Sequence, residues 1–168
     1  KLLKANKLDE AGKMLFENNP LTTVCSLVCN HENQCEGHCV LGRKGAPVHF
    51  STIESYISTT YANKMTQGPA PSNGMRAAII GSGPAGLVAA YDLALRGHKV
   101  VVYEKGAAPG GQLRTGIPAF RLPPDLLDRE IAVLPQLGVE FACGTAVGKD
   151  LTLDSLQASF DAVILAAG

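Results

Sequence analysis

The chain has 168 residues and no excess of charge of either sign, because 15 Lys and Arg residues balance 15 Asp and Glu residues. A chain without a net positive field lacks the attraction that draws proteins to nucleic acid or to an anionic membrane surface. It also lacks a long apolar run: the longest, such as residues 77–80 and 100–103, are the size of strands, whereas a membrane span needs about 20 residues. We therefore expect neither nucleic acid nor a membrane as a partner.

The amino-terminal residues 1–17 carry scattered charges and no apolar core, which excludes a secretory signal. The five cysteines are an odd number, and four of them are gathered at Cys25, Cys29, Cys35 and Cys39. In a chain without export features, such a cluster favours metal ligation in a reducing cytosol over disulfides. The sequence thus predicts a cytoplasmic protein, and its 46% of apolar residues is enough to build a core.

The composition changes at residues 67–74, where two prolines and two glycines break both helix and strand. We predict a linker there, between a domain over residues 1–66 and a second domain over residues 75–168. The chain begins without Met and stops at Gly168, directly after the strand-like run 162–165. These two features predict a fragment of a longer protein.

The first domain is predicted to be all-helical. Helices are expected at residues 8–18, with Ala11, Met14 and Leu15 at helical spacing, and at residues 51–62, with Ile53, Tyr56 and Ile57 on one face and Ser51 as a possible cap. About seventy residues rarely bury enough apolar surface unaided. The cysteines therefore suggest short helices held around a metal centre.

The second domain begins with a strand, a glycine turn and a helix, at residues 76–80, 81–86 and 85–96, followed by a strand over 99–103 that closes on Glu104. This order is typical of the glycine-rich fingerprint of dinucleotide-binding domains. In it Gly81 permits the tight turn, Gly83 lets the backbone approach a pyrophosphate and Gly86 lets the helix pack on the strand. The fingerprint expects an acidic residue about 20 positions further on, and Glu104 meets this expectation. Its carboxylate would accept ribose hydroxyls and disfavour a 2′-phosphate. We therefore predict a Rossmann-like site for FAD or NAD. The overall fold class is α + α/β.

Simpler roles are expected for several other polar residues. His31 and His38 are interpreted as surface residues, and Cys143 as a small buried apolar residue. A helix near residues 125–134 should bury Leu126, Leu127, Ile131 and Leu134 and expose Asp125, Asp128, Arg129 and Glu130.

Several segments together resemble the glutamate synthase small-subunit family, which extends to the amino-terminal part of dihydropyrimidine dehydrogenase and to the NADPH-side subunit of NADH-dependent ferredoxin:NADP oxidoreductase. The segments that carry the resemblance are residues 19–29, 35–39 and 47–48 in the first half, and residues 110–114, 116–123 and 165–168 in the second. Ala167 stands where the family usually has threonine.

The resemblance implies two 4Fe-4S clusters whose ligands come partly from this segment and partly from a cysteine group further upstream. Matching positions, Cys29 and Cys35 would serve one cluster together with Glu54, Cys39 would serve the other, and Cys25 need not ligate iron. Because the upstream group is absent from this sequence, neither cluster is complete here. A zinc-stabilised module and merely buried thiols remain as alternatives.

The resemblance also implies which residues contact FAD. They are Gly81, Ser82, Gly83, Pro84, Ala85, Gly86, Glu104, Lys105, Gly111, Leu113, Arg121 and Val147. Arg121 has a guanidinium suited to phosphate or to flavin carbonyls, although it can also simply pair with Asp125 on the surface.

In complete relatives NADPH reduces FAD, and electrons pass singly through the clusters to a large catalytic subunit or a fused catalytic domain. The resemblance therefore implies an oxidoreductase segment with FAD, 4Fe-4S clusters and, through a domain beyond Gly168, NADPH. Because the cofactors carry this chemistry, we assign no catalytic acid, base or nucleophile. The fragment alone is expected to be inactive. The alternatives are a non-catalytic docking module and a zinc-binding adaptor, and the final electron acceptor depends on the partner.

Overall fold

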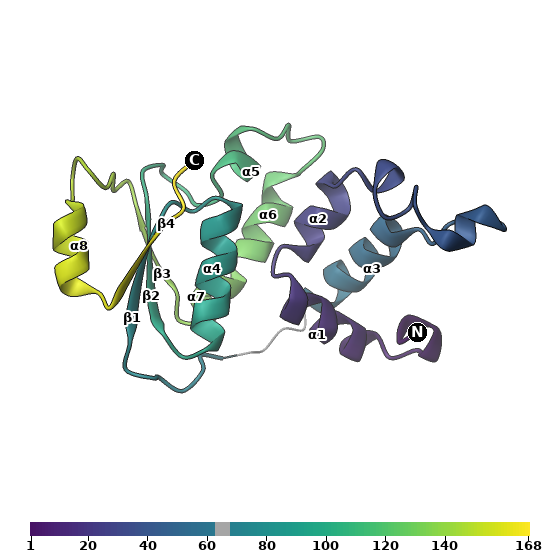
Figure 1. Cartoon of the computed structure of the whole chain (residues 1–168), viewed down its shortest axis with the longest axis horizontal. Coiled ribbons are helices and arrows are strands. Elements are labelled where there is room, and N and C mark those ends of the chain that lie inside the picture. The colour runs from purple at the N-terminus through teal and green to yellow at the C-terminus, as the bar shows by residue number, and fades with distance from the viewer. Residues whose placement is uncertain (63–67) are drawn as a thin grey trace. The chain divides into compact units, whose positions relative to one another are not determined.

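The computed structural model describes residues 1–62 and 68–168, and its contacts divide the chain into two units (Figure 1). The first unit holds the amino-terminal residues and the tripeptide Phe120–Leu122, and the second holds the rest. The predicted end of the first domain at residue 66 and the predicted start of the linker at Gln67 lie outside the described residues.

The first unit is built from helices. Its elements are η1 (Leu3–Ala5), α1 (Leu8–Asn18), α2 (Thr22–Val28), η2 (His31–Asn33), η3 (Val40–Arg43) and α3 (Phe50–Ala62). Both α1 and α2 pack against α3. The buried apolar residues of this unit include Ala11, Phe16, Leu21, Val24 and Ile57, and the buried polar side chains beside them include the fully buried Thr22 and Ser58.

The predicted helices α1 and α3 are present, but their buried faces differ from the expectation. In α1 the buried residues are Ala11, Gly12 and Phe16, whereas Met14 is 54% exposed. The reason is Gly12: a Cβ at this position would lie 2.1 Å from Cγ of Tyr61, so the glycine lets α3 approach α1. In α3, Tyr56 was expected on the buried face and is also exposed.

The helix α2 was not predicted from the sequence. It carries the adjacent Thr22, Thr23 and Val24, whose β-branched side chains lower helix propensity, and all three are buried. Packing against α3 therefore decides the conformation of this segment.

The second unit contains a parallel four-stranded sheet in the order β3-β2-β1-β4. Its strands are β1 (Arg76–Ile80), β2 (Lys99–Glu104), β3 (Glu140–Cys143) and β4 (Ala162–Leu165). Between β1 and β2 the chain forms α4 (Pro84–Leu95), which packs on both strands. The fully buried Ala78, Ile79, Val100, Val102 and Leu87 form the centre of this core. The predicted βαβ unit is confirmed.

The remaining helices of this unit are α5 (Gln112–Thr115), α6 (Pro124–Ile131), α7 (Val133–Gln136) and α8 (Leu153–Ser159). The single helix expected near residues 125–134 is two helices, α6 and α7, that meet at Ala132. Pro135 has no N–H to donate to Ile131, so one continuous helix would lose a hydrogen bond there. The expectation that Glu130 faces solvent is wrong, because this side chain is 4% exposed.

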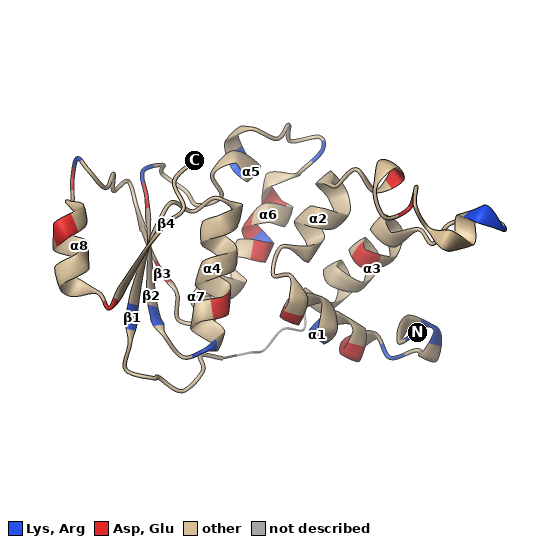
Figure 2. Cartoon of the chain, viewed as in Figure 1, with Lys and Arg blue, Asp and Glu red and all other residues tan. Residues whose placement is uncertain are grey.

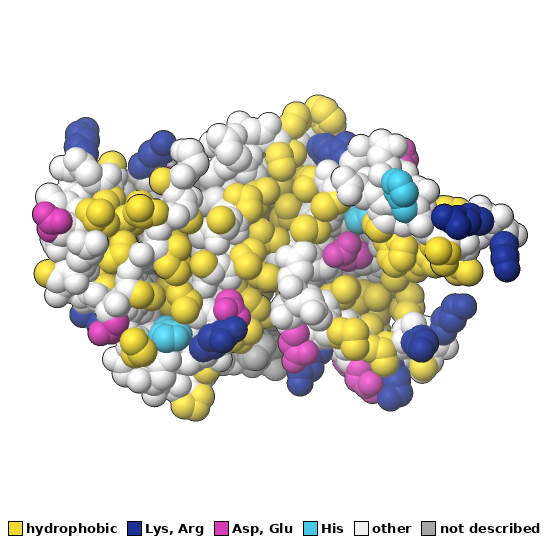
Figure 3. Space-filling model, viewed as in Figure 1, with side chains coloured by type: hydrophobic (Ala, Val, Ile, Leu, Met, Phe, Trp, Pro, Cys, Tyr) yellow, Lys and Arg dark blue, Asp and Glu magenta, His cyan; other side chains and the backbone are white. Residues whose placement is uncertain are grey.

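Charges of both signs occur on both units, and exposed apolar side chains are found on each (Figures 2 and 3). The most exposed large apolar residues include Val40 and Leu41 in the first unit and Leu165 in the second. Among residues 1–62 and 68–168, none of the helices has the length and apolar character that a membrane crossing requires.

The contact at Gly12 predicts that Gly12→Ala destabilises the first unit, although alanine is the better helix former by about 1 kcal/mol. The added Cβ must displace the Tyr61 ring, and overpacking of this kind costs about 1–3 kcal/mol. Chemical denaturation followed by circular dichroism measures the change. In a Tyr61→Ala background the same substitution should no longer destabilise, and an equal cost in both backgrounds would contradict this explanation.

Candidate functional site

The glycine turn after β1 is held by very close backbone packing. Gly81 has φ +102°, and a Cβ there would lie 2.6 Å from the carbonyl oxygen of Ala166. Its N–H donates to the carbonyl oxygen of Tyr103 at 2.8 Å. A Cβ on Gly86 would lie 2.0 Å from the carbonyl oxygen of Gly81. Both positions therefore require glycine for the fold itself, in agreement with the roles predicted for them.

Gly83 differs from these two glycines. Its backbone angles, φ −70° and ψ −177°, are ones that any residue adopts, and no atom lies within 4 Å of the position of its Cβ. The protein's own packing does not require glycine here. The open space lies directly before Pro84, the first residue of the twelve-residue helix α4, whose N-terminal N–H groups favour an anion. This arrangement fits the approach of a pyrophosphate to the backbone.

Ser82 and Glu104 meet beneath this turn. Ser82 is fully buried and Glu104 is 8% exposed. The Glu104 carboxylate accepts hydrogen bonds from the N–H and the hydroxyl of Ser82, at 3.0 and 2.5 Å, and from the N–H of Gly106 at 2.7 Å. Burial works to raise the pKa of Glu104, but these hydrogen bonds outweigh it, so the pKa is lowered. The carboxylate is therefore stabilised in its ionised form.

The segment Gly110–Gly111 lies against the glycine turn. The N–H of Gly110 donates to both the carbonyl and the hydroxyl oxygen of Ser82, each at 3.1 Å. Gly111 has φ +50°, and a Cβ on it would lie 2.8 Å from the Cα of Gly83. The fold thus brings together the predicted residues 81–86, Glu104 and Gly111.

The other predicted flavin contacts have different surroundings. Leu113 is 8% exposed and belongs to the core, whereas Lys105 is exposed next to Glu104. Val147 is half-buried in the segment after β3, where it forms a bridge with Leu151. Arg121 belongs by its contacts to the first unit, where it donates to the carbonyl oxygen of Val28 at 3.2 Å. Asp125, the partner that the sequence offered for Arg121, pairs with Arg129.

In the first unit, Cys25 and Cys29 lie one helical turn apart at α2 and its end. The thiol of Cys25 is half-buried and accepts a hydrogen bond from Nδ2 of Asn19 at 3.1 Å. Burial raises the pKa of Cys25, and the neighbouring Cys29 and Glu54 raise it further, against the effect of Asn19. Cys25 is thus kept as a neutral thiol, whereas Cys29 is exposed.

The remaining cysteines of this segment have polar neighbours. Nδ1 of His31 lies 3.2 Å from Sγ of Cys35, and its Nε2 lies 3.2 Å from the carbonyl oxygen of Cys25. His31 is therefore more than the free surface residue that the sequence suggested. Hydrogen bonds from the backbone N–H of Val48 and of Leu41 lower the pKa of Cys39, which favours the thiolate that ligates metals.

Glu54 accepts a hydrogen bond from the hydroxyl of the buried Thr22 at 2.7 Å, which joins α2 to α3. In the described part of the chain, no three His, Cys, Asp or Glu side chains are close enough together to hold a metal ion. Among the described residues, the predicted ligands Cys29, Cys35, Cys39 and Glu54 are thus not gathered into a metal-binding group.

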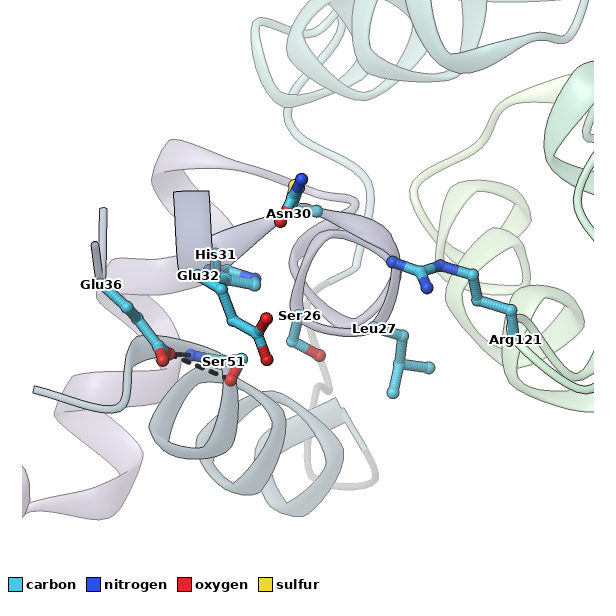
Figure 4. A pocket seen from close by; sticks show the side chains of 9 residues that line it. Ser26, Leu27, Asn30, His31, Glu32, Glu36, Ser51 and Arg121 are labelled. Carbon is cyan, nitrogen blue, oxygen red and sulfur yellow. Dashed lines mark hydrogen bonds between the residues drawn. The ribbon is translucent and has the colours of Figure 1, made fainter. Parts of the chain in front are cut away.

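A cavity of about 430 Å³ opens beside Cys29 (Figure 4). Its lining includes Ser26, His31, Glu32, Glu36 and Arg121. In Figure 4 the Arg121 side chain points toward α2, at whose last residue it makes its hydrogen bond. The cavity is polar and contains groups of both signs.

Sequence reasoning missed the role of Glu36. Its carboxylate accepts hydrogen bonds from the N–H of Ser51 at 2.9 Å and from the Ser51 hydroxyl at 3.1 Å, and these bonds lower its pKa. Glu36 thereby caps α3, a role for which the sequence suggested Ser51. The sequence offers no local pattern for this cap, because Glu36 lies 15 residues before Ser51. The acidic residue in the loop that precedes α3 is the one available signal.

Comparison with known proteins gives two family matches. Residues 1–66 match the family described as dihydropyrimidine dehydrogenase domain II, 4Fe-4S cluster. Residues 79–131 match the NAD(P)-binding Rossmann-like domain. The two matches correspond to the cysteine segment and to the glycine turn with its surrounding strands.

Among similar proteins, the NAD-dependent dihydropyrimidine dehydrogenase subunit PreT of Escherichia coli O157:H7 is 39% identical over 94% of this chain and 39% of its own length. The NADPH glutamate synthase small chain of E. coli K12 is 38% identical over the whole chain and 36% of its own length. A mutant of FprA from Mycobacterium tuberculosis superposes with a TM-score of 0.51 and 25% identity, over 59% of this chain and 23% of that one. The chain spans less than two fifths of the curated relatives named here, and over that span it is similar to the glutamate synthase small chain and to the dihydropyrimidine dehydrogenase subunit PreT.

Proposed function

We propose that this chain is the electron-transfer segment of an NADPH-dependent oxidoreductase, which passes electrons between NADPH, FAD and 4Fe-4S clusters to a partner subunit or domain. The observation that carries the proposal is the pairing within one chain of a cysteine segment with a glycine turn whose Gly83 faces open space. The first feature suits iron ligation and the second suits a dinucleotide.

The second unit would hold FAD. Gly83 leaves room for the pyrophosphate, and Ala85 and Gly86 in the first turn of α4 would supply N–H groups toward it, since Pro84 has none. Glu104 already accepts three hydrogen bonds from the protein, two on Oε2 and one on Oε1, so one lone pair of Oε1 remains for a ribose hydroxyl. Bound FAD would supply the conversion between hydride transfer and single-electron transfer.

The first unit would contribute ligands to the clusters. Cys29 and Cys35 are exposed thiols, and Cys39 is the cysteine whose thiolate form is favoured. Glu54 is held in place by Thr22, so an oxygen ligand from α3 would be fixed before iron arrives. We assign Cys29, Cys35 and Glu54 to one cluster and Cys39 to the other, with the remaining ligands from outside this sequence.

The partner is proposed from the names of the relatives. PreT and the glutamate synthase small chain are both named as parts of larger enzymes, a subunit and a small chain. By analogy, a large catalytic subunit or fused domain would take the electrons, in a role like that of glutamate synthase. Flavin, iron and zinc analysis of the full-length protein, purified without oxygen, tests the proposal. Zinc without flavin would contradict it.

Gly83→Val should abolish FAD retention in the full-length protein while leaving the second unit folded, since its side chain would fill the space reserved for the pyrophosphate. We expect roughly a tenth or less of the wild-type flavin content, because each 1.4 kcal/mol of lost binding lowers affinity about tenfold. Flavin absorbance and circular dichroism together measure the outcome.

Gly68→Val is a matched control, because Gly68 also has open space around its Cβ but lies outside the turn. Gly86→Ala should lose flavin for a different reason, since its Cβ would collide with the Gly81 carbonyl and damage the fold. Full flavin content in folded Gly83→Val protein would defeat the assignment of the turn.

Removing the proposed ligands one at a time should separate the two clusters. In the full-length protein, Glu54→Ala and Cys29→Ala should damage the same electron paramagnetic resonance signal, and Cys39→Ala the other, because a lost ligand affects only its own cluster. Cys25→Ala should spare both, since its thiol is protonated and already bonded by Asn19. Cys143→Ala in the other unit serves as the control. The assignment would be refuted if Cys25→Ala and Cys39→Ala both destroyed the same electron paramagnetic resonance signal while Glu54→Ala changed neither signal.

A further inference from the structure

The hydroxyl of Ser82 does not face the open side of the glycine turn. Ser82 is fully buried, whereas the space at the neighbouring Gly83 is open. The hydroxyl donates to Oε2 of Glu104 and accepts from the N–H of Gly110. The hydroxyl proton and one of its two lone pairs are thus used inside the protein, so the buried hydroxyl has no proton left to donate to a phosphate.

These bonds connect three separate parts of the chain. Ser82 belongs to the turn after β1, Glu104 ends β2, and Gly110 begins the segment that lies against Gly83. Glu104 extends the connection through Oε1, which accepts from the N–H of Gly106. A single buried network therefore sets the distance between the glycine turn and the segment 106–111.

We propose that Ser82 and Glu104 form a buried latch that positions Gly110–Gly111 against Gly83 and thereby shapes the second wall of the dinucleotide site. Ser82 is in this sense a positioning residue rather than a contact of the cofactor. The two segments are packed so closely that a Cβ added to Gly111 would lie 2.8 Å from the Cα of Gly83. A small displacement of the segment 110–111 therefore changes the space next to Gly83.

The latch explains why the side chain at position 82 is polar although it is buried. A buried hydroxyl and carboxylate are tolerated only when their hydrogen bonds are satisfied, and a satisfied network fixes one arrangement of the segments that it joins. Here the carboxylate accepts three bonds, and the hydroxyl donates one and accepts one. The backbone carbonyl of Ser82 also accepts from Gly110, but only the hydroxyl joins this segment to Glu104.

The inference rests on the proposed function for its ligand, FAD, but its first test does not need the flavin. In flavin-free full-length protein, Ser82→Ala should speed amide hydrogen exchange over residues 110–116 by at least about fivefold, because Gly110 keeps only its bond to the Ser82 carbonyl and the link through the hydroxyl to Glu104 is lost. Exchange in β1, β2 and α8 should stay as in the wild type. Ser159→Ala, an exposed serine in α8 of the same unit, is the matched control.

The second readout is the dissociation constant for FAD, which should rise about tenfold in Ser82→Ala although the variant removes no atom that contacts the ligand. If Ser82→Ala fails to fold, Glu104→Gln tests the same latch by hydrogen exchange alone, because a glutamine cannot accept from both Ser82 and Gly106 with its two terminal atoms and Glu104 is itself a proposed ribose contact. Unchanged exchange over residues 110–116, or an equal rise throughout the second unit, would overturn the latch. Wild-type protein that binds no FAD would overturn the proposed function alone, because the exchange result is read without it.

Discussion

The second unit depends on the contact between backbone atoms at Gly81. The carbonyl of Ala166, after β4, occupies the space where any other residue would place its Cβ, and the carbonyl of Gly81 does the same at Gly86. Two glycines therefore allow β1, β4 and α4 to meet at one point. Everything else in the candidate dinucleotide site, from the open Gly83 to the buried Ser82, is placed relative to this contact.

The first unit is held by a different kind of interaction. Its apolar core is small, and its helices are joined by individual polar contacts, such as Thr22 with Glu54 and Glu36 with Ser51. A unit of this size gains much of its stability from a bound metal when one is present. Under the proposed function, the exposed Cys29 and Cys35 would become iron ligands and add to the stability of this unit.

The sequence predicted the second unit more closely than the first, and the reason is physical. Strands β1 and β2 and helix α4 follow local periodicity and glycine chemistry, so their positions could be read from residues 76–104 alone. The buried face of α1 could not, because it depends on Tyr61 reaching Gly12 from a distant helix. The capping of α3 by Glu36 and the burial of Ser82 likewise come from long-range contacts that leave no local pattern. The roles of the individual residues toward flavin and iron stay predictions.

The pairing of β1 with β4 also has a consequence for how this unit folds. The N–H of Arg76 donates to the carboxylate of Asp161, 85 residues later in the chain. The strands β2 and β3, which come between β1 and β4 in sequence, lie on the opposite side of β1 from β4. Long-range parallel pairing of this kind has a high contact order and folds slowly. During synthesis, the edge of β1 that pairs with β4 therefore stays unpaired until residues 162–165 have left the ribosome, and an unpaired strand edge favours aggregation.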